Sequence, residues 1–346
     1  MIKYPKYKVA AAHIAPVFND NEKSLDKACD AIAEAARQDI KLLAFSECFL
    51  PGYPFWSRVA RPTDSETFFI EHASRAIRIN GPEINRLRAA ARKHDIMVSM
   101  GFSEGTDISV GCLWNSNVLI GNDGSILNHH RKLVPTFYEK LVWANGDGAG
   151  LRVSDNGFGR VGMLICGENT NPLARFTLMA QGEQVHIATY HGMTAGPASD
   201  GTGGYDVQAG IRIRAAAHSF EAKAFTIVAS TPWDHTARAA LEPLGKEILD
   251  RFDSGTRTIS MIVDPMGKRI SEELCEDEGF AVAEIDLVQA VKLKRIHDVV
   301  GYYNRFDIFN LTVNRKANRP VTFIDGPDEG ASDCNALMDD GSMTID

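Results

Sequence analysis

The sequence lacks long hydrophobic runs, paired cysteines and an excess of positive charge. No apolar stretch approaches the ~20 residues that a transmembrane helix needs, and the first residues contain no apolar segment of the signal-peptide kind. We therefore expect neither a membrane protein nor an exported one. The net charge of -8 at pH 7 argues against binding to nucleic acid or to an anionic membrane.

The six cysteines form no Cys-x-x-Cys pair, and the histidines show no metal-ligand spacing. His129 and His130 are adjacent, and neighbouring residues of a strand point to opposite faces, so a two-ligand metal site is not expected there. Scattered cysteines suit a reducing compartment better than a disulfide framework. We predict a cytoplasmic protein that needs no metal and no organic cofactor.

Strand and helix patterns alternate along most of the chain. Apolar stretches that predict strands lie at 8–14, 42–45, 96–102, 117–121, 125–130, 161–165, 185–189, 225–230, 258–263 and 268–270. Helical periodicity is found at 66–78, 83–94, 172–181 and 206–222. A capping box at Asn19 and Glu22 predicts one more helix, with Leu25 and Ile32 on its apolar face. This interleaving is typical of an α/β fold in which helices cover sheets.

No linker interrupts this alternation before residue 320, so we predict one domain over residues 1–319. The remaining residues, 320–346, are an acidic tail that contains glycine and serine and shows no periodicity, expected to be disordered or docked on a neighbouring subunit. The segment 192–204 contains five glycines and is expected to form a mobile surface or lid loop.

Three reactive side chains stand where an apolar strand ends. Glu47 follows the strand at 42–45, Lys132 follows the strand at 125–130, and Cys166 follows the strand at 161–165. Open α/β sheets place their chemistry in the crevice at such strand ends. A carboxylate, an amine and a thiol together are the parts of a nucleophilic site that uses no histidine.

The same segments resemble a known family. Phe45-Ser-Glu-Cys-Phe-Leu-Pro-Gly-Tyr-Pro54, His130-Arg-Lys-Leu-Val-Pro-Thr136 and Cys166-Gly-Glu-Asn-Thr-Asn-Pro172 are similar, in order and spacing, to the three catalytic signatures of the carbon-nitrogen hydrolase (nitrilase) superfamily. The match extends over roughly residues 6 to 315. The Pro-Gly-Tyr-Pro turn and the Glu-Asn after the cysteine resemble the nitrilase branch. Gly167 departs from that branch, in which many members have tryptophan.

The resemblance implies an αββα sandwich, with two facing sheets covered by helices. It implies catalytic roles for Glu47, Lys132 and Cys166 and a supporting role for Glu139. It further implies a twofold dimer that builds larger homo-oligomers or spirals, hydrolysis of a small nitrile by water, and a carboxylic acid and ammonia as products.

The residues themselves support this chemistry. A nitrile carbon is a weak electrophile, so attack needs a thiolate, and an ordinary cysteine with a pKa of ~8.5 is mostly protonated near neutrality. We expect Glu47 to act as general base toward Cys166 and Lys132 to stabilise the developing negative charge. Glu139 is expected to orient Lys132 or the hydrolytic water.

The pocket is less well defined by the sequence. Candidate substrate-binding residues are Tyr53, Trp143, Glu168, Asn169, Tyr190 and His191. Large aromatic residues are also ordinary core residues, and turn capping explains Asn169 nearly as well.

Ordinary structural roles compete with each catalytic assignment. A cysteine in an apolar strand is usually a small core residue, and a glutamate beside Lys140 forms surface ion pairs as readily as it supports catalysis. Within the enzyme class, the alternatives are an amidase and a hydratase-type or cyanide-specific member. Outside it, the alternative is a non-catalytic assembly protein, which is disfavoured because all three reactive groups are present.

Overall fold

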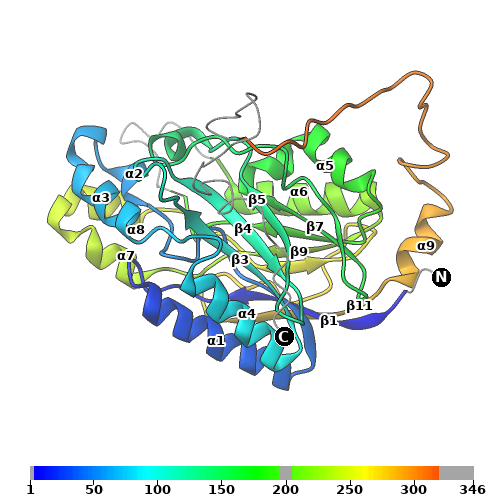
Figure 1. Ribbon diagram of the computed structural model, residues 1–346, viewed down its shortest axis with the longest axis horizontal. Helices are drawn as coiled ribbons and strands as arrows, with labels where there is room; N and C mark the ends of the chain where they lie inside the picture. The colour runs from blue at the N-terminus through cyan, green and yellow to red at the C-terminus, as the bar shows by residue number, and fades with distance from the viewer. Residues whose placement is uncertain (1–3, 195–204, 319–346) are drawn as a thin grey trace, which may run out of the picture.

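Two β-sheets form the centre of the protein in the computed structural model, which describes residues 4–194 and 205–318 (Figure 1). The first sheet has the strand order β11-β1-β2-β3-β4-β5 and the second the order β10-β9-β8-β7-β6. The strands are β1 Lys6–His13, β2 Ile40–Ala44, β3 Met97–Glu104, β4 Trp114–Ile120, β5 Ile126–Arg131, β6 Ser154–Asp155, β7 Arg160–Ile165, β8 Val185–Thr189, β9 Phe225–Ala229, β10 Met261–Val263 and β11 Gly279–Asp286. The helices are α1 Asn21–Arg37, α2 Trp56–Val59, α3 Glu66–Ser74, α4 Pro82–His94, α5 Pro172–Met179, α6 Val207–Ala222, α7 His235–Ala240, α8 Lys246–Asp253 and α9 Val288–Lys294.

Parallel strands occupy the middle of each sheet. In the first, β1 pairs in parallel with β2 and β2 with β3, while β11, β4 and β5 run antiparallel to their neighbours. In the second, β7, β8 and β9 are parallel. The carboxyl ends of the parallel strands in a sheet therefore lie at one edge, where their following loops meet.

The two sheets pack face to face through a shared apolar core. Alternate residues of β1 and β2, among them Val9, Ala11 and Leu42, face Val161, Ile187 and Ile227 of the second sheet, and all are fully buried. Residues of opposite parity on the first sheet, such as Ala10 and Leu43, face the helices instead. The near-continuous apolar strands are thus explained, because both faces of each sheet are covered.

Helices form the outer layers. Helices α1 and α4 pack on the outer face of the first sheet, whereas α6 packs on that of the second, beside α5 (Figure 1). The order of layers is helix, sheet, sheet, helix. The predicted αββα sandwich is therefore confirmed.

The start of α1 differs from the prediction by one residue. The N-cap is Asp20, whose side chain accepts a hydrogen bond from the backbone N–H of Lys23 at 3.0 Å. Asn19 lies outside the helix with a left-handed φ of 57°. The capping box at Asn19 and Glu22 was therefore wrong, because a carboxylate at Asp20 caps the helix three residues before Lys23.

Other differences occur in both halves of the chain. Strand β11 and helices α7, α8 and α9 were not predicted, and helix α3 ends at Ser74 instead of residue 78. Ile77 has left the helix and pairs with Glu104 in an isolated bridge. The hairpin after residue 258 is confirmed in a shorter form, with strand β10 at Met261–Val263.

The acidic tail, 320–346, and most of the glycine-rich loop lie outside the described residues, so the division into one domain and a tail stays a prediction. Within residues 4–194 and 205–318, no helix is both long and apolar enough to span a bilayer.

Candidate active site

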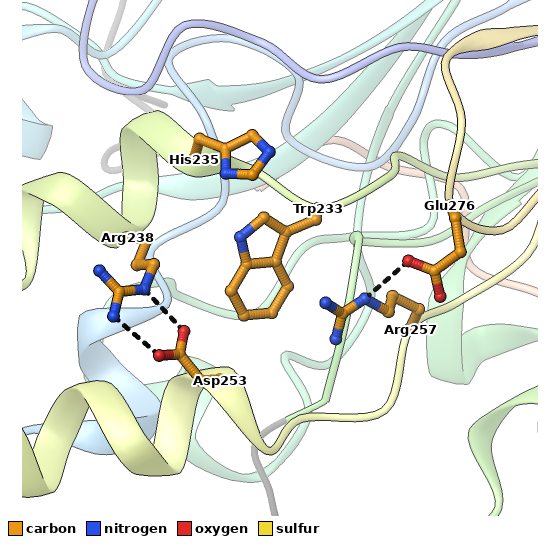
Figure 2. A pocket seen from close by; sticks show the side chains of 6 residues that line it. All are labelled: Trp233, His235, Arg238, Asp253, Arg257 and Glu276. Atoms are coloured by element: carbon orange, nitrogen blue, oxygen red, sulfur yellow. Dashed lines mark hydrogen bonds and ion pairs between the residues drawn. The ribbon is translucent and has the colours of Figure 1, made fainter.

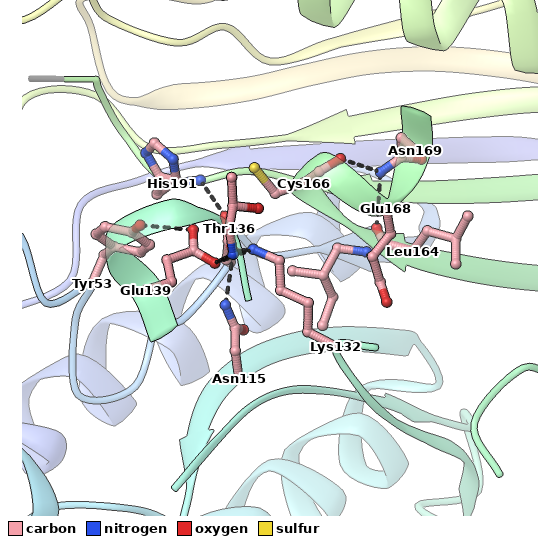
Figure 3. A network of polar contacts seen from close by, with 12 residues as sticks. Tyr53, Asn115, Lys132, Thr136, Glu139, Leu164, Cys166, Glu168, Asn169 and His191 are labelled. Carbon is pink, nitrogen blue, oxygen red and sulfur yellow. Dashed lines mark hydrogen bonds and ion pairs between the residues drawn. The ribbon is translucent and has the colours of Figure 1, made fainter. Parts of the chain in front are cut away.

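Glu47, Lys132 and Cys166 meet at the carboxyl edge of the two sheets. Glu47 comes from the loop after β2, Lys132 directly follows β5, and Cys166 directly follows β7. Figure 3 shows Lys132 and Cys166 with the residues around them. The Nζ atom of Lys132 donates to Glu47 Oε1 at 2.7 Å and to Glu139 Oε2 at 2.6 Å. Both carboxylates and the ammonium group are essentially inaccessible to solvent. The site therefore combines residues from both sheets.

The carboxylate of Glu47 accepts hydrogen bonds from three donors. Oε1 accepts from Asn115 Nδ2 at 2.7 Å as well as from Lys132, and Oε2 accepts from the backbone N–H of His191 at 3.1 Å. The loop can reach this position because β3 carries Gly101 where it passes. A Cβ there would overlap the backbone carbonyl of Ser46.

The pKa of Glu47 is raised. Burial is the main cause, because it disfavours the charged carboxylate, and the nearby negative charge of Glu139 adds to it while Lys132 opposes it. A carboxyl group with a raised pKa is a better proton acceptor in the range where enzymes work. Glu47 is thus suited to act as a general base.

Glu139 lies on a 3₁₀ turn, Phe137–Leu141, and accepts two further hydrogen bonds. Oε2 accepts from the backbone N–H of Thr136 at 2.8 Å, and Oε1 accepts from the Tyr53 hydroxyl at 2.8 Å. Burial alone would raise the pKa of Glu139, but the charge and hydrogen bond of Lys132 outweigh it and the pKa is lowered. Glu139 is therefore the ionised partner that fixes Lys132.

Lys132 is an ammonium ion. Burial would lower its pKa, but the two carboxylates more than compensate and the pKa is raised. It stays a cation throughout the neutral range and lies between two anions, so the charges of the three side chains sum to minus one when Glu47 is ionised.

Cys166 opens the turn after β7 with a left-handed φ of 50°, a conformation that few residues with a Cβ adopt. Its Sγ lies within 4.8 Å of a carboxylate oxygen of both Glu47 and Glu139 and of a ring nitrogen of His191. Burial raises the pKa of this thiol to about 12, and the charge of Glu47 contributes. The resting group is a thiol, so attack requires removal of its proton by a neighbouring base.

These four side chains are of the types that bind metal ions. The ammonium of Lys132, however, hydrogen-bonds both carboxylates and so occupies the place of a cation between them. A divalent ion here would have to compete with it. The predicted absence of a metal cofactor stays a prediction.

Tyr53 and His191 line the site beside the carboxylates. Their rings lie 4.3 Å apart between centroids, and the Tyr53 hydroxyl contacts Glu139. Trp143 packs edge-on behind Tyr53 and donates from Nε1 to Ser103 at 2.9 Å. Its place favours support of Tyr53 over the predicted contact with substrate.

Tyr190 is buried against α6 in a cluster that also includes Ile211, and the partly buried Cys166 packs against this cluster. This position favours a role in packing over the predicted contact with substrate.

Glu168 and Asn169 lie on the far side of the turn that begins at Cys166. Glu168 accepts from the backbone N–H groups of Leu133 and Ile165 at 2.6 and 2.7 Å. Asn169 donates to backbone carbonyls of the turn. These contacts favour support of the turn over the predicted binding of substrate.

Arg58 is a site residue that the sequence analysis did not find. It lies on α2, donates from Nε to the Tyr53 hydroxyl at 3.2 Å, and reaches within 3.8 Å of Glu139. The Pro-Gly-Tyr-Pro turn just before it was the available signal, since that turn leads the chain from Glu47 across the site. Asn115 was also missed by the sequence analysis. It lies on β4 next to Lys132, which follows the neighbouring strand β5, and the backbone N–H of Lys132 donates to the carbonyl of Asn115.

A hollow on the surface lies apart from this site, around α7 and α8 (Figure 2). Its two arginines are already paired, Arg238 with Asp253 at 2.8 Å and Arg257 with Glu276 at 3.1 Å. Arg257 also lies over the ring of Trp233 at 4.0 Å. No charge there is left unbalanced among these pairs, and Glu47, Lys132 and Cys166 do not line it.

Comparisons with known proteins agree with this geometry. The carbon-nitrogen hydrolase family model matches residues 8–295. A nitrilase of Paraburkholderia phymatum is 35% identical over 314 residues, covering 91% of this chain and 88% of that protein. A bromoxynil-specific nitrilase of Klebsiella pneumoniae subsp. ozaenae is 32% identical, covering 98% and 95%.

A similar fold is found in the crystal structure of the C. elegans NitFhit protein. The TM-score is 0.68 at 21% identity, with 92% of this chain and 70% of that chain covered. The family match spans most of the described sheets and includes Glu47, Lys132 and Cys166. The chain therefore belongs to the carbon-nitrogen hydrolase family.

Proposed function

We propose that this protein is a nitrilase, which hydrolyses an organic nitrile to a carboxylic acid and ammonia. The observation that carries the proposal is the contact of one buried ammonium, Lys132, with two buried carboxylates beside the thiol of Cys166. The nitrilase names of the relatives at 32% and 35% identity support the choice of substrate class.

In the first step, Glu47 takes the proton of Cys166 as the sulfur attacks the nitrile carbon. A C–S bond forms, one π bond of the nitrile breaks, and the nitrogen receives a proton from Glu47. The product is a thioimidate. Lys132 lies beside the carboxylate that exchanges this proton and stabilises negative charge as it develops, an effect of about 2.7 to 4 kcal/mol for one such donor.

Water then adds to the thioimidate carbon, again losing a proton to Glu47. Glu47 returns this proton to the nitrogen, which becomes an amine. The proton of the new hydroxyl group then passes through Glu47 to the nitrogen, the C–N bond breaks, ammonia leaves and a thioester remains. A second water attacks the thioester, the C–S bond breaks, and the thiol of Cys166 is restored with the acid as product. Two waters are consumed for each nitrile, and Glu47 accepts and returns a proton in each step.

Loss of the sulfur instead of ammonia from the tetrahedral intermediate would release an amide. Glu47 is within reach of the reacting atoms and raised in pKa, so it can protonate nitrogen before sulfur leaves. Ammonia loss is therefore the favoured outcome, and amide is a side product for electron-poor nitriles, whose nitrogen is less basic.

Tyr53 and His191 are the proposed walls of the substrate pocket, since both flank the carboxylates. The experiment that tests the function is a panel of aliphatic, aromatic and arylaliphatic nitriles, scored separately for ammonia, acid and amide. Acid and ammonia in equal amounts are expected. Dominant amide would move the assignment to a hydratase, and release of ammonia from amides but not from nitriles would move it to an amidase.

We further propose that the protein forms a homodimer that builds larger assemblies. Exposed apolar side chains occur on the outer helices, with Leu173 on α5 and Ile213 and Phe220 on α6. The segment 302–311, which extends away from the body after α9 (Figure 1), carries exposed Tyr302, Phe306 and Phe309. Burial of such surface between copies is the ordinary way to remove it from water.

Light scattering of the full chain and of a chain ending at residue 319 tests this proposal. Dimers or larger species are expected for the full chain. A strict monomer at micromolar concentration in both proteins would contradict it.

A further inference from the structure

A second network of buried polar side chains lies directly behind the nucleophile. Asn169 donates from Nδ2 to the carbonyl of Cys166 at 3.0 Å and to the carbonyl of Leu164 at 3.3 Å (Figure 3). Its Oδ1 lies 2.8 Å from Nε2 of His186. Nδ1 of His186 lies 2.7 Å from Oε1 of Glu183. The chain of contacts thus runs from the peptide of Cys166 to a fully buried carboxylate.

The direction of these hydrogen bonds is fixed by what each group can do. Carbonyl oxygens only accept, so the amide nitrogen of Asn169 must face the turn and its oxygen must face His186. His186 therefore donates from Nε2. Its other nitrogen faces Glu183, which as a carboxylate also only accepts. Both ring nitrogens of His186 thus face acceptors, Asn169 Oδ1 and the carboxylate of Glu183.

Glu183 has a second partner on helix α6. Its Oε2 accepts from Nε2 of His218 at 2.7 Å, and the two histidine rings lie 3.8 Å apart between centroids. Burial would raise the pKa of Glu183, but the positive charge of His186 and the contacts with His218 lower it to about 2. The carboxylate is thus ionised and bridges strand β8 and helix α6.

The backbone around this network leaves room for it. Gly162 on β7 lies opposite His186 in the ladder with β8. A Cβ at Gly162 would overlap the carboxylate of Glu183. The same strand ends, after Ile165, at Cys166. A side chain at Gly162 would therefore displace the network and the nucleophile strand together.

Cys166 needs such support because its backbone is strained. Its φ of 50° lies in the left-handed region, which a residue with a Cβ adopts only when its surroundings hold it there. Asn169 binds the carbonyls on both sides of the strained residue, at Leu164 and at Cys166 itself. Together with the bond from the Ile165 N–H to Glu168, these two bonds hold the backbone that sets the direction of the Cα–Cβ bond of Cys166.

We propose that His186, held by Glu183, is a positioning residue that acts through Asn169 to hold Cys166 in its reactive orientation. The proposal rests on the assignment of Cys166 as nucleophile. His186 itself contacts neither the carboxylates of the site nor the space beside the thiol. Its effect is on the rate of attack by the sulfur and not on the affinity for substrate.

The test compares His186→Gln and Asn169→Asp with a matched control, His13→Gln. His13 is also a fully buried histidine with two partners, Ser260 Oγ at 2.8 Å and the Cys275 carbonyl at 3.1 Å, but it lies on β1 outside the network. Steady-state kinetics, thermal unfolding and the rate at which iodoacetamide alkylates Cys166 are measured for each full-length variant.

We expect kcat to fall about 10- to 100-fold in His186→Gln and Asn169→Asp, as for misplacement of a reacting group. KM should change less than about threefold, and alkylation should slow together with kcat. His13→Gln should lose thermal stability but keep kcat and the alkylation rate. If His186→Gln does not fold, Asn169→Asp and Gly162→Ala decide by the same measurements.

Equal kcat and alkylation rates in the network variants and in His13→Gln would overturn the proposal. The outcome is separable from the assignment of the nucleophile. Turnover that survives Cys166→Ala would remove that assignment, whereas an inactive Cys166→Ala beside a fully active His186→Gln would remove only the positioning role.

Discussion

Arg58 donates a hydrogen bond from Nη2 to Nε2 of His191 at 3.1 Å. A guanidinium has no acceptor, so Nε2 of His191 accepts and the ring is neutral with its proton on Nδ1. Burial, followed by the charges of Arg58 and Lys132, holds the pKa of His191 well below its usual range. The histidine beside the thiol therefore does not serve as an acid in the neutral range.

The charge of Arg58 also helps to lower the pKa of Glu139. Arg58→Gln removes this charge but keeps an amide donor, so the pKa of Glu139 should rise toward its ordinary value. In the unchanged protein the lowered pKa keeps Glu139 ionised down to acidic pH. In the variant Glu139 should become protonated at a higher pH, so the loss of activity on acidification should also begin at a higher pH. Profiles of kcat/KM against pH measure this. An acidic limb that coincides with that of the unchanged protein would contradict the role of Arg58.

Cys166→Ala should reduce turnover by more than about 10⁴-fold, because the covalent pathway is lost. Cys48 is the matched control. It adjoins Glu47 in sequence, but its thiol points away and donates to the carbonyl of Gly52 at 3.3 Å. Cys48→Ala should keep most of the activity, with a loss of stability from the small cavity. Mass spectrometry of trapped intermediates should find the adduct on the Cys166 peptide alone.

Glu47→Gln and Lys132→Ala should each remove nearly all activity. Combining either with Cys166→Ala should add little, because residues that act as one unit are not additive. Lys132→Ala also leaves two buried carboxylates without their cation, and should destabilise the fold by about 3 to 5 kcal/mol. Kinetics and urea unfolding of single and double variants test both statements. If the factor by which activity falls in a double variant equals the product of the factors in the two single variants, the groups do not act together.

Glu139→Gln should be impaired less than Glu47→Gln. The amide can still accept from the Tyr53 hydroxyl, but it no longer balances the charge of Lys132. We expect a decrease in kcat of about 10- to 100-fold. An effect as large as that of Glu47→Gln would give Glu139 a direct part in proton transfer.

Stability should fall on acidification even before the carboxylates titrate. Burial, with the charge of His186, lowers the pKa of His218 to about 4. The unfolded chain then binds the proton first, so the stabilisation is complete above pH ~6.5 and is lost as pH falls toward 4, by about 3 kcal/mol. Urea unfolding of the protein and of His218→Asn from pH 7 to 4 measures it. If the free energy of unfolding falls with pH as steeply in His218→Asn as in the unchanged protein, the titration of His218 does not explain the loss of stability.

Turnover should be independent of metal ions. The Lys132 ammonium already bonds both carboxylates, and the proposed proton transfers use Glu47. Dialysis against a chelator should leave the rate unchanged. Activity that disappears on dialysis and returns with a divalent metal would show that the carboxylates and Cys166 bind an ion.

The sequence was sufficient to place the three reactive groups because each follows a short apolar strand, and strand ends of an α/β fold converge. It was insufficient for residues whose role depends on the path of a loop. Apart from the Pro-Gly-Tyr-Pro turn before it, nothing in the sequence distinguishes Arg58 from a surface arginine. Glu168 and Asn169 adjoin Cys166, yet the tight turn directs them away from the thiol, and no periodicity describes a turn.

The missed elements have a similar reason. Strand β11 buries only Ala281, Ala283 and Ile285, and it gains its identity from pairing with β1, which lies more than 260 residues earlier in the chain. The short helices α7 and α8 are held by packing of Ala237 and Phe252 against aromatic residues near Tyr53. Tertiary contacts, and not local propensity, decide such segments.

The division of the reactive groups between two sheets has a consequence for refolding. The backbone of Glu47 donates to the carbonyl of Tyr190 at 3.2 Å, and the backbone of His191 donates to Glu47 in return, so loops from separate sheets are tied together. Neither sheet alone holds both the base and the thiol. Recovery of turnover after dilution from denaturant must therefore lag behind the return of secondary structure, and the lag measures how long the two halves take to find each other.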